Sequence, residues 1–137
     1  MPIKSPAYTR SVKLVDAAIM QPVDIQAKRK DYRTLQAGTF TASGNTADID
    51  LSDFSAVELV FKVTAVSGTS PTLDLYFEGK FEATGDYKVL ASQTGITGTG
   101  TWFATVNPLI FRYVRVRWVV GGTSPSFTFT VAAQLMV

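Results

Sequence analysis

The sequence predicts an all-β protein: an antiparallel β-sandwich of about eight strands, with a jelly roll as first choice and an immunoglobulin-like Greek key as second, preceded by an extended N-terminal arm. Three observations lead to this prediction. From residue 39 onward the chain consists of short runs of Val, Ile, Phe, Thr and Tyr, separated by Gly, Ser, Asn, Asp and Pro. Within the runs, apolar and polar residues alternate. One loop sequence, Gly-Thr-Ser-Pro, occurs twice.

The alternation defines the individual strands. In VELVFKVTAV, the side chains of Val57, Leu59 and Phe61 face one side, whereas Glu58 and Lys62 face the other. This pattern is typical of a half-buried strand, and the later segments follow the same rule. The predicted strands lie near residues 34–42, 46–51, 56–66, 72–79, 87–92, 101–106, 111–121 and 126–136.

The repeated loop lies at residues 68–71 and again at 122–125, each time between two amphipathic segments. We therefore predict two β-hairpins with these residues at their tips, because glycine allows the positive φ that such loops often need. The similarity continues upstream at the same spacing, so the chain is predicted to have two related halves, about 39–80 and 94–135. One half alone cannot cover its apolar faces, and a closed two-layer sandwich solves this problem.

Residues 1–33 lack the alternation and are predicted to form an arm, whereas residues 34–137 form the sandwich domain. The arm contains a candidate short helix, SVKLVDAAIM, which ends before Pro22. Residues 1–38 carry seven basic and three acidic side chains, although the net charge of the whole chain is only +2. We expect this basic and partly apolar arm to dock on a partner; a frayed tail is the alternative.

The arm residues expected to contact the partner combine apolar and basic side chains. They are Ile3, Lys4, Tyr8, Arg10, Lys13, Leu14, Ile19, Lys28, Arg29, Lys30 and Arg33. The cluster KRKDYR also fits a nucleic-acid or nuclear-import patch. Its position between the arm and the first strand favours electrostatic docking on an acidic protein surface.

The composition argues against catalysis. The chain has no cysteine and no histidine, which excludes thiolate chemistry, cysteine-based metal sites and the commonest general base. No carboxylate pair, serine triad or phosphate-binding loop stands out. We therefore predict that the protein is not an enzyme and has no cofactor. The absence of an apolar run of about 18 residues and of a signal-peptide pattern predicts no membrane span and synthesis in the cytoplasm.

The carboxylates Asp48, Asp50 and Asp53 suit either a hard cation or plain solvation. Their spacing departs from the EF-hand loop and the turn glycine of that loop is missing, so we predict solvated carboxylates and no metal site.

The basic strand with Arg112, Arg115 and Arg117 suits phosphates or an acidic partner, but ion pairs with Glu58 or Asp74 on neighbouring strands explain it equally well. Interleaved exposed aromatic residues are missing, so no nucleic-acid binding is predicted.

Tryptophan suggests one more kind of site, a carbohydrate-binding surface on which Trp102 or Trp118 stacks against sugar rings. Strand alternation requires that one of Trp102 and Phe103 faces inward, so a place in the core is the simpler interpretation.

The segments VTAVSGTSPTLDL, TGITGTG and RYVRVRWVVGGTSPSFTFTV resemble small virion proteins of tailed bacteriophages that are encoded among the head and morphogenesis genes. The resemblance covers about residues 39–135 and leaves the arm outside. Some members of this group resemble jelly-roll cement or decoration proteins, which attach to the outside of an assembled icosahedral shell and lock neighbouring capsomers together. Similar sandwiches occur in tail and baseplate parts.

The resemblance implies a structural protein that is made in the host cytoplasm and ends on the capsid surface of the virion. Its implied partners are the major capsid protein and further copies of itself, in a homodimer or homotrimer, with no nucleic acid and no membrane. The alternatives are a tail, baseplate or host-attachment component and, further away, a carbohydrate-binding module.

Overall fold

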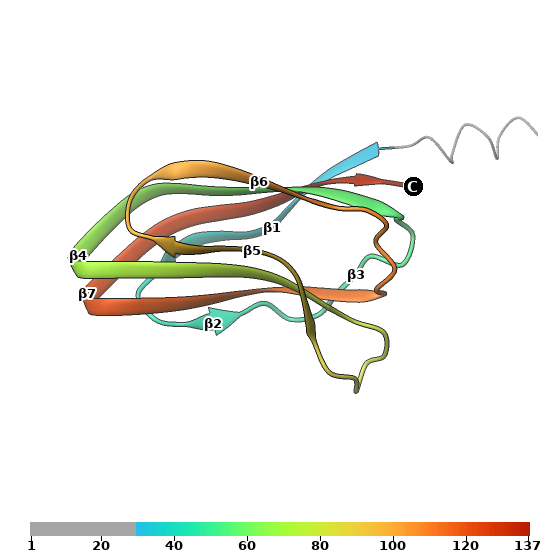
Figure 1. Ribbon diagram of the computed structural model, residues 1–137, viewed down its shortest axis with the longest axis horizontal. Coiled ribbons are helices and arrows are strands. Elements are labelled where there is room, and N and C mark those ends of the chain that lie inside the picture. Colours follow the sequence, from blue (N-terminus) through green and yellow to red (C-terminus); the bar gives the residue numbers. More distant parts are fainter. Residues whose placement is uncertain (1–29) are drawn as a thin grey trace, which may run out of the picture. The chain divides into compact units, whose positions relative to one another are not determined.

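The computed structural model describes residues 30–137, and within this range it contains β-strands but no helix (Figure 1). The strands are β1 (Lys30–Phe40), β2 (Gly44–Asn45), β3 (Ile49–Asp50), β4 (Ala56–Lys80), β5 (Lys88–Ile96), β6 (Gly100–Val106) and β7 (Tyr113–Met136). The all-β class is therefore confirmed. The candidate helix at residues 11–20 lies outside the described residues.

Strands β4 and β7 are long and bent, and each contributes one half to each of two layers (Figure 1). In the first layer, which we call the β6 layer, the order is β1, the second half of β7, the first half of β4 and β6. In the second, the β5 layer, the order is β2 and β3, the first half of β7, the second half of β4 and β5. All pairings are antiparallel. Two such interlocked layers form a jelly roll, which confirms the first-choice fold.

The Gly-Thr-Ser-Pro segments are not hairpin tips, and in this respect the prediction was wrong. Residues 56–66 pair with 126–136 and with β6, not with residues 72–79. The two segments instead lie side by side, with Thr69 opposite Thr123, and form the corner where the paired β4 and β7 cross from one layer to the other (Figure 1). Alternation specifies the face of each residue but not the neighbouring strand.

The expected positive φ is present at both glycines, with values of 112° at Gly68 and 110° at Gly122. A Cβ on Gly68 would lie 2.6 Å from the backbone oxygen of Ser124, and one on Gly122 would lie 2.7 Å from that of Ser70. Each glycine thus packs against the other segment in an equivalent way. The repeat in the sequence produces a nearly two-fold corner, in which neither segment has room for a side chain at its glycine.

The core lies between the two layers and follows the predicted alternation. Apolar residues on the inner faces are almost completely buried; the largest are Phe61, Phe77, Phe127, Phe129, Leu51, Leu59, Leu73, Leu75 and Leu135. Burial of this apolar surface is the main force that holds the layers together.

Strand β1 begins at Lys30, before the predicted start near residue 34. Lys30 lies opposite Met136, and Arg33 lies opposite Ala133. Residues 30–33, which we assigned to the arm, are therefore part of the β6 layer. A register shift between Thr34 and Gln36 interrupts the alternation, which explains why the sequence pattern begins later than the strand.

Candidate interaction surfaces

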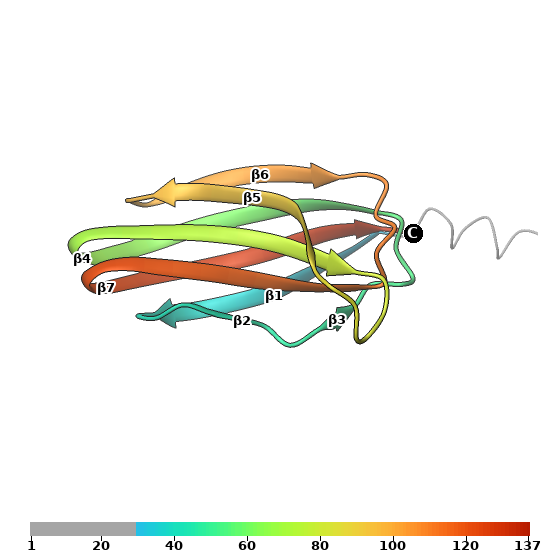
Figure 2. The ribbon, with the colours of Figure 1, turned by 60° about the horizontal axis from the view of Figure 1, so that its bottom comes forward.

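One end of the sandwich collects the start of β1, the end of β7 and the loops that follow β3, β4 and β6 (Figure 2). Backbone hydrogen bonds hold it together: the amide of Ser55 donates to the carbonyl of Met136 at 2.8 Å, and the amide of Leu109 donates to that of Ser55 at 2.7 Å. We call this region the arm end, because the predicted arm joins the sandwich here.

The arm end presents large apolar side chains to solvent. Phe81 is 61% exposed and Ile110 is 64% exposed, and the ring of Phe81 stacks on that of Phe111 with centroids 4.4 Å apart. Tyr32 and Met136 are also exposed. Grouped exposed apolar residues are typical of surfaces that contact another protein.

A hollow of about 200 Å³ opens beside Met136 on the outer side of the β6 layer. It is lined by Ala56, Val57, Glu58, Thr105, Asn107, Gln134 and Met136. Met136 is the member of this lining that also belongs to the exposed apolar residues of the arm end.

Sequence reasoning missed these apolar residues, because residues 80–86 were interpreted as a loop, residues 107–110 fell between two predicted strands, and Phe111 was placed at the start of the predicted strand 111–121. The available signal was the presence of Phe81 and Ile110 in segments without strand alternation, where a polar loop residue is the more common choice.

Of the residues predicted to bind a partner, Lys30 and Arg33 are described. Lys30 is exposed at the start of β1. The Nε of Arg33 lies 3.1 Å from Oδ2 of Asp31, and its guanidinium lies 5.0 Å from the ring centre of Phe54. The remaining candidates lie outside the described residues: Ile3, Lys4, Tyr8, Arg10, Lys13, Leu14, Ile19, Lys28 and Arg29.

The outer face of the β5 layer carries a cluster of ion pairs centred on Glu78. This side chain is only 6% exposed and lies between two arginines. Arg115 donates from Nε to Oε1 at 2.9 Å, and Arg117 donates from Nε to Oε2 at 3.0 Å. The guanidinium of Arg117 also lies 4.1 Å from the ring centre of Tyr76, and that of Arg115 lies 3.6 Å from that of Tyr87.

Arg115 and Arg117 therefore pair with Glu78, and not with Glu58 or Asp74, which were the partners considered in the ion-pair alternative. Glu78 lies directly opposite Arg115 in the register of β4 and β7. Burial raises the pKa of the Glu78 carboxyl, but hydrogen bonds from Arg117 and Arg115 lower it by more, so the pKa lies below its ordinary value. The hydrogen bond to Glu78 raises the pKa of Arg117.

A second ion pair adjoins this cluster. Lys80, which is buried, places Nζ 2.7 Å from Oδ2 of Asp48 and donates to the carbonyl of Ala83 at 2.8 Å. The hydroxyl of Tyr87 donates to the same aspartate. The hydrogen bonds from Lys80 and Tyr87 lower the pKa of the Asp48 carboxyl, and the hydrogen bond to Asp48 raises the pKa of the Lys80 ammonium group. Each of these five charged side chains thus has an ion-pair partner within the sandwich.

Two of the three aspartates of the DIDLSD segment, Asp48 and Asp50, have different partners. Asp48 binds Lys80 and Tyr87, whereas Asp50 accepts a hydrogen bond from the amide of Ser52 and lies 3.5 Å from Nε of Arg112. Among residues 30–137, no group of three His, Cys, Asp or Glu side chains is placed to hold a metal ion. The same residues contain no helix that is long and apolar enough to span a membrane.

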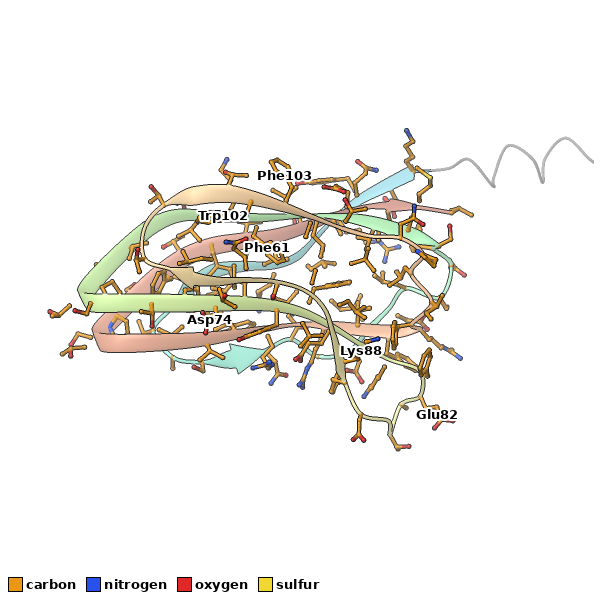
Figure 3. All side chains as sticks on the ribbon, viewed as in Figure 1. Phe61, Asp74, Glu82, Lys88, Trp102 and Phe103 are labelled. Atoms are coloured by element: carbon orange, nitrogen blue, oxygen red, sulfur yellow. The ribbon has the colours of Figure 1, made fainter. Side chains whose placement is uncertain are left out.

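The tryptophans do not form an exposed platform. Trp118 is 5% exposed and donates from Nε1 to the carbonyl of Ala42 at 3.0 Å, so it is a core residue and is not available to stack on a sugar ring. Trp102 is half-buried on the inner side of β6, next to Phe61, whereas Phe103 is on the outer side and is 66% exposed (Figure 3).

Comparison with known proteins identifies the fold. The chain is similar to the SPBc2 prophage-derived protein YomS, with 15% sequence identity and a TM-score of 0.51 over 80% of this chain and 94% of YomS. It also aligns with a chain of the T13 particle of infectious bursal disease virus, with 12% identity and a TM-score of 0.49, over 80% of this chain but only 31% of the viral one. No protein-family model matches the sequence, and no curated protein matches it significantly. The chain therefore shares its fold with a prophage-derived protein.

Proposed function

We propose that this chain is a structural protein of a bacteriophage virion, of the decoration or cement type, which binds the outside of the head through its N-terminal arm. The observation that carries the proposal is that the arm end combines the start of β1 with exposed apolar side chains. The predicted arm leads directly into β1 at Lys30, and exposed apolar residues such as Phe81 and Ile110 lie at the same end of the sandwich. The fold shared with a prophage-derived protein supports a phage origin.

The proposed partner is the outer surface of the major capsid protein. The basic residues of the arm suit an acidic surface, and its apolar residues add buried area. Within the sandwich, Arg115 and Arg117 are held by Glu78, which favours a protein partner over nucleic acid. Many equivalent sites on one shell raise the total strength of attachment above that of a single contact.

Removal of residues 1–29 is expected to abolish binding to heads while the sandwich stays folded. The deletion ends before Lys30 because β1 starts there and pairs with β7. We expect binding to purified heads, measured by co-sedimentation, to fall by at least about 100-fold because every site loses its arm contacts. Circular dichroism and thermal unfolding check that the fold is kept.

A charge variant tests the electrostatic part with the chain length unchanged. Lys28→Glu/Arg29→Glu should weaken co-sedimentation, and the difference from the natural protein should shrink at high salt. The control is Lys62→Glu, an exposed position in the first half of β4 that lies away from the arm end, and this variant should bind heads normally. Full binding by the truncated chain contradicts the arm assignment. In electron micrographs, label on the tail instead of the head supports the tail or baseplate alternative.

A further inference from the structure

Strand β6 has an edge that is open to pairing. In the part of the chain that the structure describes, β6 pairs with β4 alone, through residues 57–63, and its other edge has no partner strand. The strand contains no charged residue and no proline, and its pairing with β4 has no register shift. A regular, uncharged edge strand is a ready template for another strand.

The other described edges are protected. Strand β1 carries Lys30, Asp31 and Arg33 and a register shift, and β5 pairs with two register shifts. Strands β2 and β3 are two residues long each. Charges, bulges and short length are the usual means by which sheet edges avoid association. Among the described edge strands, β6 therefore stands out because it has neither charged residues, nor a register shift, nor a length of only two residues.

The outer side of β6 presents Thr101, Phe103 and Thr105, and the exposed Phe103 is the central residue of the strand (Figure 3). It lies beside Val60 on β4. The half-buried Trp102 lies on the inner side. Both aromatic side chains would lose further contact with water if a strand were added at this edge.

We propose that β6 pairs antiparallel with β6 of a second copy of this chain, about a two-fold axis at Phe103. The β6 layers of both copies then form one continuous sheet. Phe103 lies opposite Phe103 of the partner subunit, as an aromatic cross-strand pair. Trp102 lies opposite Ala104 of the partner subunit, which covers it. A two-fold interface is closed, so both open edges are used and no fibre forms.

The charges beside the edge agree with this arrangement. Lys62 flanks Thr101 on the neighbouring strand, and Glu58 flanks Thr105. In the antiparallel dimer, the row that contains Lys62 and Thr101 continues into Thr105 and Glu58 of the partner subunit, so opposite charges share a row. They are three strand spacings apart, about 14 Å, so they form no ion pair; their attraction favours this orientation at low ionic strength, where the Debye length of about 30 Å exceeds this distance. The proposal is independent of head binding by the arm.

Comparison of the natural full chain with the variant Phe103→Lys tests the interface. The natural protein should sediment as a dimer of the 14.9 kDa chain, and Phe103→Lys should weaken dimerisation by at least about 100-fold, because two lysines meet at the axis. Its unfolding temperature, extrapolated to the monomer, should change little, because Phe103 is exposed. Sedimentation is measured over a series of protein concentrations. The proposal is overturned if Phe103→Lys dimerises with unchanged affinity. It is also overturned if the natural protein is monomeric at every concentration.

Cross-linking provides a positive readout. The chain has no cysteine, so Phe103→Cys introduces a single thiol at the axis. Opposed residues in antiparallel strands are close enough for a disulfide, and mild oxidation should produce a covalent dimer. Val119→Cys, exposed on the β5 layer, is the matched control and should stay uncross-linked. Equal cross-linking of both variants, or loss of the dimer when residues 1–29 are removed, refutes the pairing of β6 with itself.

Discussion

Replacement of Gly122 by alanine is expected to destabilise the sandwich by about 3–5 kcal/mol. The φ of 110° at this position is strained for any residue with a side chain, and the new methyl group would lie 2.7 Å from the backbone oxygen of Ser70. Backbone in the opposing segment cannot turn aside as a flexible side chain can. The corner must therefore open, and the pairing between β4 and β7 on both sides of it weakens.

Thermal or denaturant unfolding measures this effect, and for a domain of this size the unfolding temperature should fall by ~15–25 °C. Gly68→Ala should behave alike, because its contact with Ser124 is equivalent. The double variant should lose less free energy of unfolding than the sum of the two single variants, since both glycines pack in the same corner.

The control is Gly98→Ala in the loop before β6, where a Cβ meets nothing within 4 Å. It should change stability by less than about 0.5 kcal/mol. If Gly122→Ala unfolds at the same temperature as this control, the corner is not the tight element that the structure describes.

The positions of most strands and their buried faces could be predicted from the sequence, because the alternation of apolar and polar residues is a local property. Each predicted strand near 56–66, 72–79, 101–106 and 126–136 is present, and Val57, Leu59 and Phe61 face the core as expected. Strand partners are a non-local property, and alternation does not contain them. The repeated loop was the one non-local signal in the sequence, and the hairpin interpretation placed its two copies apart although they lie together.

The partner of the arginines shows the same limit. Alternation placed Arg115 and Arg117 on an outer face, which is correct, but the choice of Glu58 or Asp74 required a strand register. Counting outward from Thr69 opposite Thr123 would place Val114 opposite Glu78, and the register shift between Thr69 and Thr72 moves the pairing by one residue, to Arg115. The repeat therefore indicates that β4 and β7 pair with each other, but the exact register also depends on an irregularity that alternation does not contain.

Glu78→Gln is expected to cost about 2–3 kcal/mol of stability at neutral pH. The variant keeps the shape of the side chain but removes its charge, so Arg115 and Arg117 lose the carboxylate that both contact. Both guanidinium groups keep partial access to water, which limits the loss compared with a fully buried pair. Glu82→Gln in the exposed loop after β4 is the matched control and should be nearly neutral (Figure 3).

The dependence of stability on pH separates the role of charge from that of shape. The pKa of the Glu78 carboxyl is lower in the folded protein than in the unfolded chain, so its stabilising effect is fully present above the ordinary glutamate pKa of about 4.3 and is lost as the pH falls through the folded value. The natural protein and Glu82→Gln should therefore lose stability in acid more steeply than Glu78→Gln does. Asp48 and Asp50, whose pKa values are also lowered, leave Glu78→Gln with a residual slope.

Unfolding temperatures measured between neutral pH and pH about 3 should consequently converge for Glu78→Gln and the natural protein, because protonation removes the same charge that the substitution removes. A difference that stays constant over this range means that the glutamine disturbs packing and that the ion pairs add little. Convergence means that the two arginines on β7 stabilise the outer face through Glu78. In that case the charges of this face serve the fold, and binding to a partner is left to the arm and the exposed apolar residues around it.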